Sequence, residues 1–160
     1  MYSLADPTDK QQQYRRVDMK INILIVDDCP VMRMVIKRAI NLCDFDIGEI
    51  EEAENGKEAL RKIEKNTFSL VILDLNMPVM TGSEVLAHIK LNPSIKRMPI
   101  LTVSAESNGP RVDIVSDLSS DFLHKPFSVE ALRDKMLKLL KKDSITISET
   151  GSQLVINSYL

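Results

Sequence analysis

The sequence predicts an α/β fold in which a doubly wound, five-stranded parallel sheet carries helices on both faces. The length of 160 residues suits one domain with a short appendage. From Lys20 to Lys142, short apolar runs alternate with segments of helical periodicity. Parallel strands require crossover connections, and helices usually provide them. We therefore expect a domain over residues 20–142, a polar N-terminal tail over 1–19 and a C-terminal extension over 143–160.

The expected strands are apolar runs that end at polar or turn residues. The first is β-branched and runs into an acidic pair, which is typical of a strand buried on both faces. The second is acidic and is interpreted as a solvated edge strand, with a partner surface as the alternative. Its acidic residues are Glu49, Glu51, Glu52 and Glu54. The five strands are expected at Ile21–Val26, Ile47–Ala53, Leu70–Asp74, Pro99–Ser104 and Asp121–His124.

The expected helices follow these strands. Pro30 suits the first turn of a helix, and Asp28 is a candidate for its N-cap. In this helix the apolar residues recur at helical spacing: Val31, Met32, Val35, Ile36, Ala39 and Ile40. The other helices are expected at Gly56–Lys65, Gly82–Leu91 and Ser128–Lys142, with a weaker one within Pro110–Leu118.

Charge and hydropathy exclude several classes of function. The formal net charge of −2 provides no global positive field, so direct nucleic-acid binding is not expected. No apolar run approaches the ~20 residues that span a bilayer, and the polar start does not resemble a secretory leader. We therefore expect a cytoplasmic protein without membrane insertion.

The last helix and the C-terminal extension are less defined by the sequence. Lys125 to Lys142 contains six basic and two acidic residues, and this excess suits the helix dipole. It is also compatible with an acidic partner or a homodimer. In the extension, Ile145, Ile147, Leu154 and Ile156 alternate around a polar turn. This pattern leaves two interpretations, a β-hairpin or a disordered tail.

Polar side chains stand where several of the strands end. They are Asp27, Asp28, Asp74, Ser104 and Lys125. Ligands of open parallel sheets bind at the carboxyl ends of the strands. Neighbouring carboxylates repel one another unless a cation compensates them, and an all-oxygen site suits Mg²⁺. A carboxylate, a cation, a lysine and a hydroxyl together favour phosphoryl transfer onto the carboxylate.

The ordered motifs resemble the receiver domain of two-component response regulators, over the whole of Lys20 to Lys142. Those motifs are Asp27-Asp28, Leu73-Asp74-Leu75-Asn76-Met77-Pro78 with Gly82, Val103-Ser104-Ala105 and Phe122-Leu123-His124-Lys125-Pro126-Phe127. The likeness is greatest to CheY-like stand-alone receivers. It implies a flavodoxin-like sheet of strand order 2-1-3-4-5. It also implies a sensor histidine kinase or phosphotransfer protein as phosphodonor and a protein effector downstream. Beyond its own phosphorylation and dephosphorylation, no enzyme activity is expected.

The resemblance also implies a role for each matching residue. Asp74 would be the phosphoacceptor, and Ser104 and Lys125 would contact the phosphoryl oxygens. The metal ligands for Mg²⁺, with Mn²⁺ as a substitute, would be Asp27, Asp28, Asp74 and the backbone carbonyl of Asn76. The Lys125-Pro126 peptide is expected to be cis. Ser104 and Phe122 would form the switch, with an output surface over the fourth helix, fifth strand and fifth helix.

Two alternatives remain open at this stage. A haloacid-dehalogenase-like phosphatase also uses an aspartate, a hydroxyl, a lysine and Mg²⁺. Its acidic motifs come in the opposite order, and it requires an aspartate where this chain has Asn76. The second alternative is a receiver-like binding module that acts independently of phosphorylation. It is kept open by the unusual Ser107-Asn108-Gly109-Pro110 run, which would delay the fourth helix.

Overall fold

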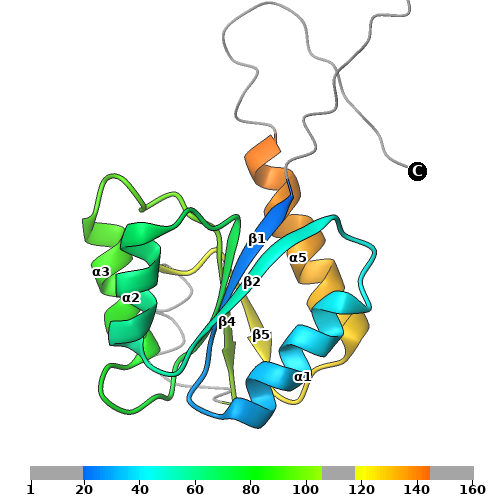
Figure 1. The fold of residues 1–160 in the computed structure, drawn as a ribbon, viewed down its shortest axis with the longest axis horizontal. Coiled ribbons are helices and arrows are strands. Elements are labelled where there is room, and N and C mark those ends of the chain that lie inside the picture. The colour runs from blue at the N-terminus through cyan, green and yellow to red at the C-terminus, as the bar shows by residue number, and fades with distance from the viewer. Residues whose placement is uncertain (1–19, 106–117, 145–160) are drawn as a thin grey trace, which may run out of the picture.

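The computed structural model describes residues 20–105 and 118–144 (Figure 1). The expected N-terminal tail lies outside these residues. So does the C-terminal extension, expected as a hairpin or a disordered tail, except for residues 143 and 144, which belong to the last helix and not to the extension. So does the helix expected within Pro110–Leu118, except for its last residue. Among the described residues, no helix is long and apolar enough to cross a membrane.

All five expected strands form one parallel sheet in the order β2-β1-β3-β4-β5, which confirms the predicted fold (Figure 1). β4 begins one residue later than expected, at Ile100. The preceding Pro99 has no N–H to donate to a ladder, although its carbonyl accepts from Val71 at 3.0 Å. The strands are β1 Ile21–Val26, β2 Ile47–Ala53, β3 Leu70–Asp74, β4 Ile100–Ser104 and β5 Asp121–His124.

In the part of the chain that the structure describes, two helices cover each face of the sheet (Figure 1). α1 and α5 lie on one face and α2 and α3 on the other (Figure 1). α5 begins at Val129 because Ser128 precedes it as a cap, its hydroxyl accepting the Ala131 N–H at 3.1 Å. The helices are α1 Pro30–Asn41, α2 Gly56–Lys65, α3 Gly82–Leu91 and α5 Val129–Ser144.

The start of α1 corrects one expectation, because Asp28 is not the N-cap. The N-cap residue is Cys29, whose side chain makes no capping hydrogen bond. The Cys29 N–H instead donates to Asp27 Oδ1 at 2.8 Å. The backbone turn at the end of β1 is therefore closed by Asp27, and the Asp28 side chain is exposed.

The core consists of one apolar layer on each face of the sheet. Alternate residues of β1 point to opposite layers, as a strand requires. Leu24 and Val26 pack on the α2–α3 side, whereas Ile23 and Ile25 pack on the α1–α5 side. Each of these side chains is buried, which removes apolar surface from water and stabilises the fold. The packed core thus holds the carboxyl ends of β1 and β3 in fixed positions.

The edge strand β2 is tied to helices on both sides by ion pairs. Glu52 contacts Arg33 at 3.0 Å and Lys37 at 3.1 Å, both on α1. Glu51 contacts Lys62 of α2 at 3.3 Å. β2 is the edge strand that the sequence predicts, and Glu49 and Glu54 are exposed. Glu51 and Glu52 are only partly exposed, because their carboxylates pair with basic side chains of the neighbouring helices.

Candidate functional site

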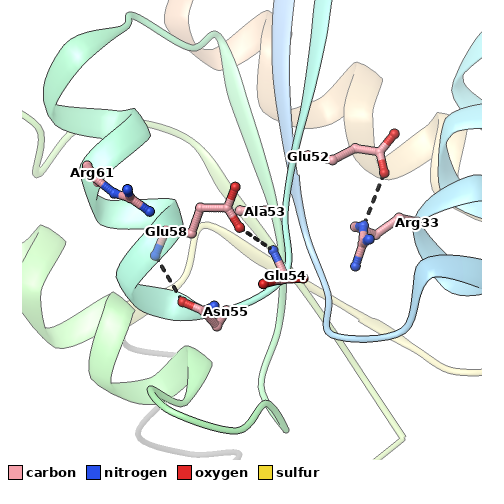
Figure 2. Close-up of a pocket in the computed structure, with 7 residues that line it drawn as sticks. All are labelled: Arg33, Glu52, Ala53, Glu54, Asn55, Glu58 and Arg61. Carbon is pink, nitrogen blue, oxygen red and sulfur yellow. Dashed lines mark hydrogen bonds and ion pairs between the residues drawn. The ribbon is translucent and has the colours of Figure 1, made fainter.

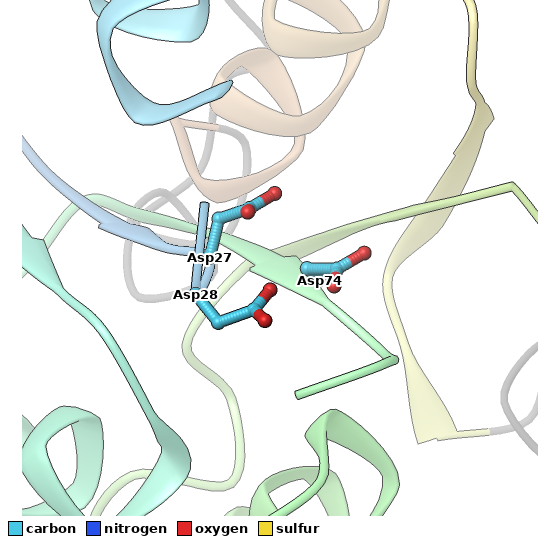
Figure 3. Close-up of side chains that lie close together, drawn as sticks. All are labelled: Asp27, Asp28 and Asp74. Carbon is cyan, nitrogen blue, oxygen red and sulfur yellow. The ribbon is translucent and has the colours of Figure 1, made fainter. Parts of the chain in front are cut away.

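Three carboxylates meet where β1 and β3 end. Asp27 and Asp28 directly follow β1, and Asp74 is the last residue of β3. Each offers one oxygen, and these oxygens lie within 4.8 Å of one another; their carboxylates turn toward the same side (Figure 3). Asp27 is 1% and Asp74 6% exposed, whereas Asp28 is exposed. One exposed and two buried acids thus form a single carboxylate cluster.

Lys125 is the cationic partner of the two buried acids. Its Nζ lies 2.8 Å from Asp27 Oδ2 and 3.1 Å from Asp74 Oδ1. The Lys125-Pro126 peptide is cis, as expected, and the Lys125 N–H donates to the Ser104 carbonyl at 2.8 Å. Burial would lower the pKa of Lys125, but the two carboxylates outweigh it and raise that pKa. Lys125 therefore remains an ammonium ion in this site.

The pKa of Asp74 is raised by the balance of several neighbours. Burial raises it most, and the Asp27 charge adds to the rise. The Lys125 ammonium and a hydrogen bond from the Asn76 N–H act in the opposite direction. One lysine thus compensates two buried carboxylates only in part, so a further cation would favour the ionised form of Asp74.

Ser104 and Phe122 lie on neighbouring strands close to this carboxylate cluster. Ser104 ends β4 and is fully buried. Phe122 pairs in register with Thr102, two residues before Ser104. Phe122 is partly buried and packs on the α2–α3 side of the core. By strand alternation, Thr102 and Ser104 face the same side. The serine and the aromatic ring thus occupy one face, as a coupled switch requires.

The loop from β3 to α3 is held close to Asp74. A Cβ on Gly82 would meet the Asp74 carbonyl oxygen at 2.2 Å, so only glycine fits there. Thr81 and Glu84 form a capping box that fixes the start of α3. Val79 has φ 69°, a left-handed conformation that is uncommon for a β-branched residue. This loop keeps the Asn76 N–H against the Asp74 carboxylate.

The donor set fits Mg²⁺. Its three carboxylates supply only oxygen ligands, which Mg²⁺ prefers, and the exposed Asp28 leaves the site accessible to water and phosphate oxygens. The structure gives no contact of the Asn76 carbonyl, whose metal role stays a prediction.

One residue of this site was not found from the sequence. Arg33, in the first turns of α1, donates from Nη1 to the Asp27 carbonyl oxygen at 2.7 Å. Arg33 belongs to none of the motifs. Only its place in the first turns of the helix that follows the acidic pair could have indicated a contact with the site.

A family model described as the response regulator receiver domain matches residues 23–137 of this chain. This match covers most of the chain, and the motifs and strand order agree with it. The chain therefore belongs to the response regulator receiver family, and its fold is CheY-like.

Particular relatives are chemotaxis proteins. CheY of Pseudomonas aeruginosa is 30% identical over 123 residues, covering 76% of this chain and 98% of the relative. CheY-3 of Vibrio cholerae is 29% identical over 127 residues, covering 79% and 96%. A similar solved structure is the response regulator TrrA of Thermotoga maritima in complex with Mg(2+)-BeF. It has a TM-score of 0.66 and 36% identity, and the match covers 75% of this chain and 99% of TrrA.

Proposed function

We propose that this protein is a response regulator whose Asp74 accepts a phosphoryl group from a phosphohistidine. The donor is a sensor histidine kinase or a phosphotransfer protein, and the phosphorylated form signals by contact with an effector protein. The observation that carries the proposal is the buried Asp74, whose Oδ1 lies 3.1 Å from Lys125 Nζ and whose carboxylate lies close to those of Asp27 and Asp28. No other catalytic activity is proposed beyond loss of the phosphoryl group to water.

The transfer step uses Asp74 as a nucleophile. A carboxylate oxygen forms a bond to phosphorus while the bond from phosphorus to the histidine nitrogen breaks. The electron pair of the broken bond stays on the imidazole, so the step is balanced without an oxidant or reductant. Mg²⁺ bound by Asp27, Asp28 and Asp74 would neutralise negative charge on the phosphoryl oxygens.

Lys125 and Ser104 are suited to hold the product. The Lys125 ammonium already contacts Asp74, so a short side-chain movement would place it on a phosphoryl oxygen. The Ser104 hydroxyl is a second donor at the end of the adjacent strand β4. A phosphoryl group adds about −1.5 to −2 charges and three acceptor oxygens, which would draw both donors inward. Phe122 would then move into the space that Ser104 leaves, and this movement would carry the signal.

The donor protein is proposed to dock on α1 beside the site. Val31, Met34 and Val35 are 60%, 62% and 47% exposed and lie three and four residues apart on one helix face. The first of them, Val31, lies three residues after Asp28, so a donor protein seated on this helix face would lie beside the carboxylate cluster. Replacing Met34 with Lys is expected to slow transfer from a phosphorylated donor protein, while labelling by the small donor acetyl phosphate is unchanged.

The acceptor role is tested by labelling with acetyl phosphate. Wild-type protein should gain one phosphoryl group in the presence of Mg²⁺ and almost none with a chelator, and Asp74→Asn should gain none. Undiminished labelling of Asp74→Asn would refute the acceptor assignment. The signalling role is tested by measuring partner affinity with and without beryllofluoride. Equal affinity in both states would support a receiver-like module that acts independently of phosphorylation.

A further inference from the structure

Arg33 links the metal-site backbone to the edge strand of the sheet. Its Nη1 donates to the Asp27 carbonyl oxygen at 2.7 Å, and its Nε donates to Glu52 Oε2 at 3.0 Å. Its side chain is only 15% exposed. Figure 2 shows this guanidinium reaching from α1 to Glu52 at the side of a polar pocket. A planar guanidinium can donate hydrogen bonds to two acceptors in a fixed geometry. A lysine ammonium, at the end of a flexible chain, holds two acceptors less rigidly.

Glu52, the second acceptor of Arg33, is held in place by strand pairing. It lies on β2 in register with Ile25 of β1, two residues before Asp27. Burial would raise the pKa of Glu52, but hydrogen bonds from Lys37 and Arg33 outweigh it and lower that pKa. Glu52 is therefore an ionised carboxylate on a paired strand, and its charge offsets part of the positive charge of Arg33 and Lys37.

The Asp27 carbonyl belongs to the peptide that joins Asp27 to Asp28. The other oxygens of Asp27 are fixed separately, Oδ1 by the Cys29 N–H and Oδ2 by Lys125. The Arg33 contact thus fixes the peptide plane from which Asp28 departs. Asp28 is the exposed member of the carboxylate group, so its direction depends most on this backbone.

We propose that Arg33 is a positioning residue for the metal site, which holds the Asp27–Asp28 peptide in the orientation that brings both carboxylates to one cation. This inference rests on the proposed function, because it assumes that the carboxylates bind Mg²⁺. Two effects of Arg33 on Mg²⁺ have opposite signs. Its positive charge repels the ion, whereas the fixed peptide favours binding. Glu52, which Arg33 shares with Lys37, offsets part of this charge, and the 2.7 Å contact acts directly on the Asp27–Asp28 peptide, so we expect positioning to dominate.

The test is calorimetric titration of the full chain with Mg²⁺ alone. Arg33→Met is expected to weaken Mg²⁺ affinity by about tenfold, as loss of an outer partner of a metal ligand commonly does. Arg33→Lys keeps the charge but not the double contact, so a several-fold loss is expected. Lys37→Met is the matched control, because it removes a positive charge from the same Glu52 cluster without touching Asp27. Its Mg²⁺ affinity should be unchanged or slightly tighter.

The outcomes separate this inference from the proposed function. If wild-type protein binds Mg²⁺ and is labelled, but Arg33→Met binds Mg²⁺ as tightly or more tightly, the positioning role is overturned and the proposed function stands. If wild-type protein neither binds Mg²⁺ nor is labelled, the proposed function itself fails. Urea unfolding without Mg²⁺ confirms that each variant is folded. Should Arg33→Met not fold, Arg33→Lys decides, because charge alone predicts no change for it.

Discussion

The ion cluster at the start of β5 predicts a defined loss of stability at acid pH. Asp121 accepts hydrogen bonds from Lys135 Nζ at 2.6 Å and Lys138 Nζ at 2.7 Å. Burial would raise the pKa of Asp121, but these lysines and the Phe122 N–H lower it from 3.8 to about 2. At about 1.36 kcal/mol per pH unit, this difference corresponds to roughly 2.4 kcal/mol. Because the Lys138 side chain is 61% exposed, screening reduces the expected contribution to about 1–2 kcal/mol.

The sign follows from the lowered pKa. The folded state binds fewer protons on Asp121 than the unfolded state, so the stabilisation is complete above about pH 4 and lost as the pH falls toward about 2. Urea unfolding of wild-type protein and Asp121→Asn measures it as a difference in the free energy of unfolding. That difference should be about 1–2 kcal/mol at pH 7 and about half as large at pH 3.

The matched control for this prediction is Asp134→Asn, which neutralises an exposed carboxylate of α5. It should differ from wild type by only a few tenths of a kcal/mol. The reasoning would be refuted by an Asp121→Asn difference that stays constant from pH 7 to pH 3, or by an equal effect of Asp134→Asn.

Three further substitutions test the site and its supports. Gly82→Ala should lower the free energy of unfolding by at least about 2 kcal/mol in urea unfolding, because its Cβ would overlap the Asp74 carbonyl; wild-type stability would contradict the close approach. Thr102→Val should raise the free energy of unfolding by about 1–2 kcal/mol, since the buried Thr102 hydroxyl has no hydrogen-bond partner among residues 20–105 and 118–144; a loss of stability would contradict this. Lys125→Met should tighten Mg²⁺ binding several-fold in calorimetry while slowing labelling by acetyl phosphate, because Lys125 is the cation that contacts the same carboxylates. Weaker Mg²⁺ binding would show that this lysine instead supports the metal site.

The strands and the main site were predictable from the sequence because both depend on short local patterns. Each apolar run ends at a residue that can no longer be buried without a partner, and in a parallel sheet these ends share one edge. Asp27, Asp74 and Lys125 could therefore be placed together before their contacts were known. The bounds of β1 and β3, the two apolar strands that end at these acids, agree with the expectation for the same reason.

Contacts between distant segments could not be read from such patterns. Asp28 suits an N-cap by residue type, but Asp27 closes the turn instead, and which acid does so depends on backbone geometry. In the sequence, nothing distinguishes Glu52 from the other acidic residues of the edge strand. Its pairing with Arg33 depends on how α1 packs against β2, across 19 positions of the chain.

The central claim is that Asp74, the acidic pair and the Ser104–Phe122 switch act as one site. It is tested most directly by following backbone amide signals by NMR as Mg²⁺ and beryllofluoride are added together. We expect the largest changes at Asp74, Ser104, Phe122 and Lys125, with no such response in Asp74→Asn. Unchanged spectra of the wild-type protein, or the same response in Asp74→Asn, would contradict it.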